Sequence, residues 1–199
     1  MRYVITIGRE YGSGGRYIGQ KLAEALNIKY YDTELLEKAS ADSGISQAVF
    51  ENYDEKPDSF LSSLMPNSYN LELSMSQKVF LAQFDTIRKI AKEESCVIVG
   101  RCADYVLRDD PNLCSFFIYS SLENRIKRAV EHYGIPEKHA KDVINKIDKK
   151  RANYYNFYSE KKWGKPESYN LCIDSSLGID ECVEVLKNFV EVKLNRNKQ

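Results

Sequence analysis

Residues 3–26, YVITIGREYGSGGRYIGQKLAEAL, decide the fold of this chain. The stretch opens with a short apolar run rich in β-branched residues, Tyr3 to Ile7, which ends at Gly8 and a further cluster of glycines. Apolar residues then recur at helical spacing from Ile18 to Leu26. A buried strand, a glycine-rich turn and an amphipathic helix predict the first half of a parallel βαβ unit.

The same alternation continues along the chain. Short apolar segments predict further strands at Lys29–Tyr31, Cys96–Val99, Cys114–Tyr119 and Leu171–Ile173. Longer amphipathic segments predict helices at Leu73–Lys92, Leu122–Tyr133, Pro136–Tyr155 and Ile179–Val192. Residues 52–70, with two prolines and four serines, are expected to form a long loop. Strands alternating with helices predict an α/β protein whose open parallel sheet is covered on both faces.

Composition and charge narrow the function classes. The 199 residues are 43% hydrophobic and 29% charged, as in a soluble globular domain. No apolar run of about 18 residues and no signal peptide are found, so we expect a cytoplasmic protein without a membrane partner. The five cysteines lie far apart and lack metal-ligand spacing, so they are expected to be free thiols.

The formal net charge of zero hides an uneven distribution. Residues 1–124 carry a net charge of −5, residues 125–165 carry +7 and residues 166–199 carry −2. A balanced total argues against a general nucleic-acid or membrane binder. The basic segment inside an acidic chain therefore predicts a local site for a small anionic ligand.

Residues directly after the strands are the candidates for binding, because ligands of parallel sheets bind beyond the carboxyl ends of the strands. In the turn from Gly8 to Arg16, glycines let successive backbone N–H groups face a phosphate at the start of a helix. Arg16 offers the positive charge that a lysine supplies in most P-loops. The other residues after strands are Asp32, Thr33, Gly100, Arg101, Ser120 and Ser121.

Five segments in this order resemble the cytidylate kinase-like family of P-loop proteins: ITIGREYGSGGRYIGQKLAEAL, YYDTELL, VIVGRCADYVL, FFIYSSLENRIKRA and YNLCIDSS. The resemblance implies one domain over residues 1–199 with a three-layer P-loop NTPase-type core. It also implies a helical insertion at residues 33–95 that binds a nucleoside monophosphate, and a helical lid at residues 121–165.

The resemblance also implies roles for individual residues. The phosphate-binding loop, which holds the ATP donor, consists of Gly12, Ser13, Gly14, Gly15 and Arg16. The acceptor site consists of Asp32, Thr33, Arg101 and Asp104. The lid arginines Arg125 and Arg128, together with Arg16, stabilise the negative charge of the phosphoryl group during its transfer. Two alternatives remain: Arg125 and Arg128 form a solvated helix face, and Asp32 caps a helix.

The sequence departs from the family pattern at the residues that handle metal. Arg16 and Tyr17 stand near the end of the glycine turn, where the usual P-loop has lysine followed by serine or threonine. Val99 replaces the acid that orients Mg²⁺ in cytidylate kinases. Mg²⁺ is expected as a cofactor beside ATP, and no metal ligand is predicted. In the lid, Arg151 is expected to take part of the role of a second Arg/Asp-rich stretch.

The function predicted from these residues is transfer of the γ-phosphoryl group of ATP to a nucleoside monophosphate, with CMP as the first choice. One alternative is a P-loop kinase for another small acceptor. A second is a nucleotide-binding regulator with little catalysis, which the missing lysine and hydroxyl favour. A nucleic-acid partner is disfavoured because the chain outside residues 125–165 is acidic.

Overall fold

The computed structural model describes residues 2–55 and 73–196. Within these residues, parallel strands form one sheet in the order β2-β3-β1-β4-β5. The strands are β1 (Val4–Arg9), β2 (Lys29–Tyr31), β3 (Cys96–Val99), β4 (Leu113–Tyr119) and β5 (Leu171–Asp174). Because every pairing is parallel, the carboxyl ends of the strands meet at one edge of the sheet.

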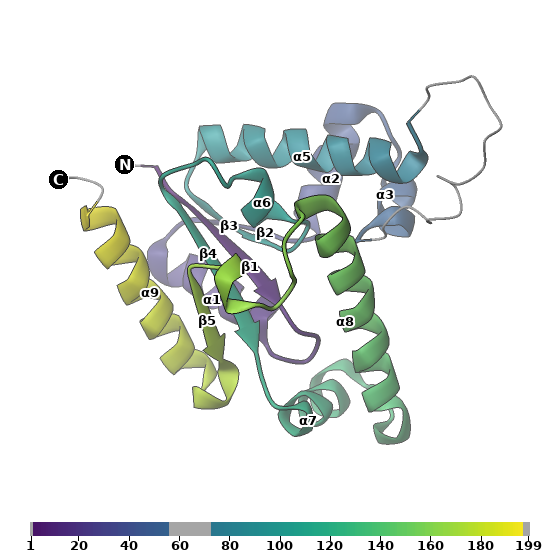
Figure 1. The fold of residues 1–199 in the computed structure, drawn as a ribbon, viewed down its shortest axis with the longest axis vertical. Coiled ribbons are helices and arrows are strands. Elements are labelled where there is room, and N and C mark those ends of the chain that lie inside the picture. Colours follow the sequence, from purple (N-terminus) through teal and green to yellow (C-terminus); the bar gives the residue numbers. More distant parts are fainter. Residues whose placement is uncertain (1, 56–72, 197–199) are drawn as a thin grey trace.

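Helices cover both faces of the sheet, as Figure 1 shows. The alternation along β1 sends Ile5 and Ile7 to one face, where α1 (Gly15–Leu26) and α9 (Ile179–Arg196) pack on them. Val4 faces the opposite side, which α5 (Met75–Glu93) and α6 (Ala103–Val106) cover. The predicted three-layer α/β core is therefore confirmed.

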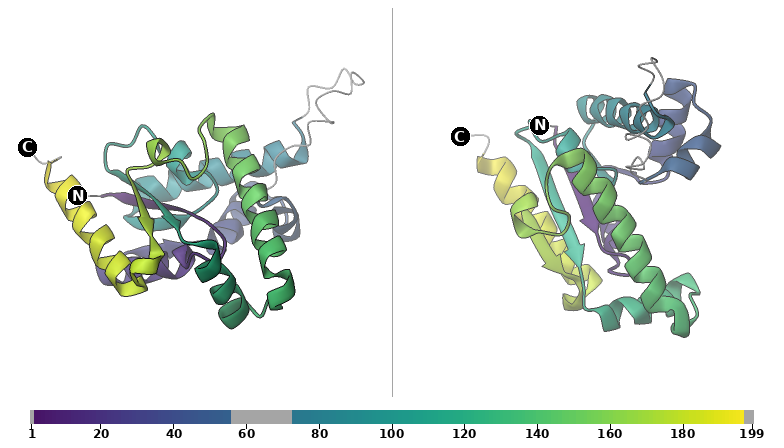
Figure 2. Two further views of the ribbon diagram at one scale, coloured as in Figure 1. Left: turned by 60° about the horizontal axis from the view of Figure 1, so that its bottom comes forward. Right: turned by 45° about the vertical axis from the view of Figure 1, so that its right-hand side comes forward.

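A helical group lies between β2 and β3 in the sequence and contains α2 (Glu34–Ser43), α3 (Gln47–Tyr53) and α5. These helices share an apolar cluster in which Leu36, Phe50 and Val79 are buried. The group stands to one side of the sheet, away from α9 (Figure 2). It falls within the range in which the insertion was predicted.

Two further helices follow β4. The first, α7 (Leu122–Tyr133), begins where the Ser121 hydroxyl accepts a hydrogen bond from the Asn124 N–H, and it ends at Gly134 in a left-handed conformation. The second, α8 (Glu137–Ser159), packs Tyr154 and Tyr155 against the sheet, in a cluster with Phe117 of β4. Figure 1 shows α8 running back from α7 towards the helical group. Short 3₁₀ turns, η1 (Pro166–Ser168) and η2 (Ser175–Leu177), flank β5.

Most predicted elements agree with the structure to within a few residues. The loop predicted from Asn52 begins later, because α3 continues through Tyr53 and is anchored by the fully buried Phe50. Residues 56–70 of that predicted loop lie outside the described residues. All five cysteines are free thiols, as expected. Among the described helices, none combines the length and apolar character needed to cross a membrane.

Candidate functional site

A cleft of about 410 Å³ opens at the carboxyl ends of β1, β2 and β3. The glycine turn forms one wall, and the ends of β2 and β3 with the residues after α3 form the other. The volume falls within the range of small-ligand sites, roughly 300–1,000 Å³. Of the predicted site residues, the cleft is lined by Gly12, Gly14, Gly15, Arg16, Asp32, Thr33 and Arg101.

The glycine turn has the geometry expected of an anion-binding loop. Gly12 and Gly14 adopt left-handed conformations with φ of 81° and 80°, which residues with a Cβ seldom adopt. The buried Ser13 hydroxyl donates to the Glu10 carbonyl (2.9 Å) and accepts from the Gly15 N–H (3.4 Å). The turn leads into α1, whose first N–H groups lack partners within the helix. The turn therefore places backbone donors and the positive end of a helix at the cleft.

Helix α7 packs directly on this turn. A Cβ on Gly12 would lie 2.7 Å from the Arg125 carbonyl oxygen, and a Cβ on Gly14 would lie 3.0 Å from Cζ of Arg128. The glycines thus serve a second purpose, because they leave room for α7 above the turn.

Arg101 is buried at the end of β3, with only 4% of its surface exposed. Its guanidinium donates to Oδ1 of Asp32 (2.5 Å), to Oδ2 of Asp54 (2.9 Å) and to the Val99 carbonyl (2.9 Å). Burial by itself lowers the pKa of this guanidinium, but the charges of Asp54, Glu55 and Asp32 outweigh burial and raise it. Arg101 is therefore a fixed positive charge in the cleft wall.

Asp32 connects Arg101 to Arg16. Its second carboxylate oxygen lies 2.7 Å from Nε of Arg16, whose side chain is 64% exposed. The N-cap of α2 is Thr33, not Asp32, and neither carboxylate oxygen of Asp32 is used as a cap. The alternative of a capping role for Asp32 is therefore wrong, since both oxygens bind arginines.

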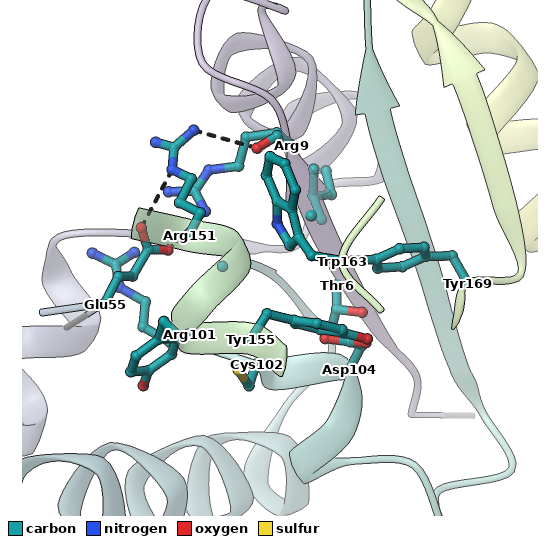
Figure 3. Close-up of a pocket in the computed structure, with 14 residues that line it drawn as sticks. Thr6, Arg9, Glu55, Arg101, Cys102, Asp104, Arg151, Tyr155, Trp163 and Tyr169 are labelled. Atoms are coloured by element: carbon teal, nitrogen blue, oxygen red, sulfur yellow. Dashed lines mark hydrogen bonds and ion pairs between the residues drawn. The ribbon is translucent and has the colours of Figure 1, made fainter. Parts of the chain in front are cut away.

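A second cluster of charged side chains borders the cleft; Arg151 was expected to act in the lid, but its grouping with Arg9 and Glu55 was not predicted. Nη1 of Arg9 lies 2.8 Å from Oε1 of Glu55, and Nε of Arg151 lies 3.3 Å from Oε2 of Glu55. Arg151 also donates to the Arg9 carbonyl (3.3 Å). Figure 3 shows Glu55 among Arg9 of β1, Arg101 after β3 and Arg151 of α8. Arg9 stands inside the glycine turn and Arg151 in the basic segment, whereas nothing in the sequence around Asp54 and Glu55 signals a site.

Asp104 lines a smaller cavity behind Arg101 and is absent from the wall of the larger cleft. This cavity, about 20 Å³, has room for about one water molecule. The Tyr155 hydroxyl donates to Asp104 (2.6 Å). Burial raises the pKa of Asp104, and the Tyr155 hydrogen bond offsets part of that rise. In Figure 3 the two side chains lie together at the foot of the pocket.

The two lid arginines have different surroundings. Arg125 is buried and pairs with Asp148 of α8 and with Glu10 of the turn (3.4 Å). The alternative of a solvated face is therefore wrong for Arg125. Arg128 lies against Gly14, and its buried Nε has no hydrogen-bond partner in the described part of the chain. The roles of both arginines in phosphoryl transfer remain predictions.

The described residues that line the cleft form no magnesium site of their own. The carboxylates of Asp32, Asp54 and Glu55 are each paired with arginine. Residues 2–55 and 73–196 contain no group of three or more His, Cys, Asp or Glu side chains arranged to hold a metal ion. Mg²⁺ prefers free carboxylate oxygens and phosphates, so none of these paired carboxylates is assigned as a metal ligand.

The five-stranded parallel sheet, the glycine turn after β1 and the arginines at the strand ends define a kinase-like P-loop protein. The chain belongs to the cytidylate kinase-like family, which it matches over residues 4–177. A search of curated proteins finds no match.

Solved structures extend the comparison. An uncharacterized protein from Eubacterium ventriosum is 35% identical, with 96% of this chain and 99% of that chain covered and a TM-score of 0.73. The fold alone is shared with shikimate kinase from Bacteroides thetaiotaomicron, at 14% identity, coverage of 95% and 98%, and a TM-score of 0.59. It is also shared with a gluconokinase from Sinorhizobium meliloti, at 15% identity, coverage of 100% and 99%, and a TM-score of 0.59.

Proposed function

We propose that this protein is a phosphotransferase that moves the γ-phosphoryl group of ATP to a nucleoside monophosphate, with CMP as the first acceptor to test. One observation carries the proposal: the glycine turn and the buried Arg101 line the same cleft. Phosphoryl transfer depends mainly on positioning and on neutralising charge, and these residues supply both.

On the donor side, the turn from Gly12 to Gly15 holds the ATP phosphates through backbone N–H groups. Arg16 is exposed at the start of α1 and exchanges Asp32 for a phosphate oxygen. Arg128 lies against Gly14, and its Nε is without a partner among the described residues, so it binds the same phosphates. Mg²⁺ is expected to arrive on the nucleotide rather than on protein ligands.

On the acceptor side, Arg101 binds the monophosphate. Its planar guanidinium is held rigidly by Asp32 and Asp54, and a guanidinium fork matches phosphate oxygens. Thr33 lines the cleft beside Asp32 and supplies a hydroxyl to the acceptor. Asp104 adds a negative charge near Arg101 on the side away from the cleft, because both residues line the smaller cavity.

Two other functions remain in competition. The first is a kinase for another small acceptor, which the paired carboxylates favour, since a cleft with Asp32 and Asp54 also suits an acceptor rich in hydroxyl groups. The second is a nucleotide-binding regulator, which the missing P-loop lysine and serine or threonine favour.

The test is ADP release from ATP and Mg²⁺ with a panel of nucleoside monophosphates, shikimate and gluconate as acceptors. The variants are Arg16→Ala and Arg101→Lys, and the control is Arg108→Ala, a 40% exposed arginine outside the cleft. We expect each site variant to lower kcat/KM for a monophosphate by at least about tenfold. Arg16→Ala removes a positive charge from the donor side, and the lysine of Arg101→Lys cannot reproduce the guanidinium fork. ATP binding without turnover on any acceptor would favour the regulator. Turnover with shikimate or gluconate, and with no nucleoside monophosphate, would favour a kinase for another small acceptor.

A further inference from the structure

The Glu55 carboxylate sits where arginines from three separate elements converge. Arg9 comes from β1, Arg101 follows β3 and Arg151 comes from α8. Arg9 and Arg151 bind the two carboxylate oxygens, at 2.8 Å and 3.3 Å, and the charge of Arg101 also acts on Glu55. Only 8% of Glu55 is exposed. Its side chain thus fills an enclosed cationic pocket (Figure 3).

The guanidinium groups around Glu55 need a negatively charged partner in this pocket. Burial and the charge of Arg9 lower the pKa of Arg151 to about 10, and Glu55 offsets part of this effect. Burial by itself raises the pKa of Glu55, but the charges of Arg9, Arg151 and Arg101 outweigh burial and lower it. Close guanidinium groups repel one another and are costly to bury without a negative partner. An anion that left this pocket would therefore have to be replaced by another.

The backbone of Glu55 is strained, and a neighbouring glycine makes room for its carboxylate. Its backbone is left-handed, with φ of 51°, which is unfavourable for a residue with a side chain. The pocket is also closed on one side by Gly100, where a Cβ would lie 2.4 Å from Nη1 of Arg9 and 2.6 Å from Oε1 of Glu55. The absence of a side chain at position 100 therefore leaves the space that the Glu55 carboxylate occupies.

We propose that the seat of the Glu55 carboxylate is a phosphate-binding site formed by Arg9, Arg101 and Arg151, and that Glu55 occupies it as an internal competitor. The ligand class is a phosphate monoester. Its phosphate has three free oxygens and up to two negative charges, against two oxygens and one charge for the carboxylate, and it therefore suits three guanidinium groups better. The inference rests on the proposed function, since the phosphate would belong to the acceptor in the adjoining cleft.

A competitor and a simple structural brace have opposite consequences for affinity. If Glu55 competes, removing its charge frees the arginines and phosphate binds more tightly. If Glu55 only braces the arginines, removing its charge disorders them and phosphate binds equally or less tightly.

The experiment is calorimetric titration of the full chain with inorganic phosphate at constant ionic strength, for the wild type and Glu55→Gln. The matched control is Glu51→Gln, because Glu51 is exposed on α3 and accepts a hydrogen bond from Gln47 of the same helix. We expect Glu55→Gln to bind phosphate at least about tenfold more tightly than the wild type, equivalent to about 1.4 kcal/mol, and Glu51→Gln to be unchanged. Equal or weaker binding by a folded Glu55→Gln would overturn the proposal.

Two double variants test whether the gain in phosphate affinity comes from the arginine pocket or from the glycine turn. The gain should disappear in Glu55→Gln/Arg151→Gln and persist in Glu55→Gln/Gly14→Ala, which perturbs the turn and its neighbours Arg128 and Ile179 and places no atom near the arginine pocket. The reverse pattern would overturn the proposal.

Glu55→Gln risks unfolding, because it leaves Arg9 and Arg151 without their paired carboxylate. Glu55→Asp keeps the charge and shortens the side chain by one methylene, so it is the second variant. We expect phosphate to raise the Tm of Glu55→Asp more than that of the wild type, and an equal rise would count against competition. Phosphate binding needs no turnover, so a gain in affinity without kinase activity would refute only the proposed function. Kinase activity without the gain would refute only the role of Glu55.

Discussion

Replacing Gly12 with alanine tests whether α7 depends on the bare backbone of the glycine turn. Gly12 has φ of 81°, and a left-handed conformation costs a residue with a Cβ about 1–2 kcal/mol. The new Cβ would also lie 2.7 Å from the Arg125 carbonyl oxygen and 3.1 Å from the Arg125 Cα. Backbone atoms cannot rotate away as a side chain does, so α7 must shift, and overpacking of this kind costs about 1–3 kcal/mol. The expected total loss of unfolding free energy is about 2–5 kcal/mol.

Gly44 provides the matched control. It ends α2 with φ of 72°, and a Cβ at this position would have no atom within 4 Å. Gly44→Ala therefore bears only the conformational cost, about 1–2 kcal/mol. Both substitutions change the entropy of the unfolded chain equally, so that contribution cancels in the comparison.

The assay is urea denaturation of the two variants and the wild type, followed by circular dichroism. The difference between Gly12→Ala and Gly44→Ala isolates the contact of α7 with the turn. If the two variants lose the same unfolding free energy, α7 does not rest on Gly12 and the reasoning is refuted.

Two other substitutions test the charged residues. Arg125→Gln leaves Asp148 and Glu10 without their partner and should lower the unfolding free energy by about 3–5 kcal/mol in urea denaturation. Arg128→Gln should leave stability nearly unchanged but weaken ATP binding. A larger loss of stability in Arg128→Gln than in Arg125→Gln would contradict these assignments. Asp104 has a raised pKa in the folded protein, so its contribution to stability is present at acid pH and is lost as pH rises through that folded pKa. The wild type should therefore lose unfolding free energy relative to Asp104→Asn as urea denaturation is repeated from pH 3.5 upwards, and a constant difference would show that Asp104 does not titrate in this way.

The fold could be predicted closely because the signals that set it are local. Runs such as CVIV at Cys96–Val99 and the glycine turn after Ile7 determine strands and their ends within a few neighbouring residues. Arg101 was predicted as a site residue for the same reason, because it directly follows a recognisable strand and ligands of parallel sheets bind beyond the carboxyl ends of the strands.

The Glu55 cluster escaped prediction because nothing local marks it. Glu55 is 46 residues from Arg9 and 96 residues from Arg151 in the sequence. Tertiary packing brings these side chains together: α8 packs on the sheet, and α3 packs within the helical group beside it. The enclosed surroundings of Arg125 are likewise tertiary, since Asp148 lies on a different helix.

The central position of β1 also governs the order in which the protein can be assembled. Val4 pairs with Cys96 on one side and with Leu113 on the other, so β1 has no neighbour in the sheet until β3, which begins at Cys96, has been made. During synthesis, Ile5 and Ile7 therefore leave the ribosome as an apolar edge with nothing to pair with. Contacts so distant in sequence slow the search for the native topology. Apolar strands that wait for their partners in this way are prone to aggregation until the later strands have been made.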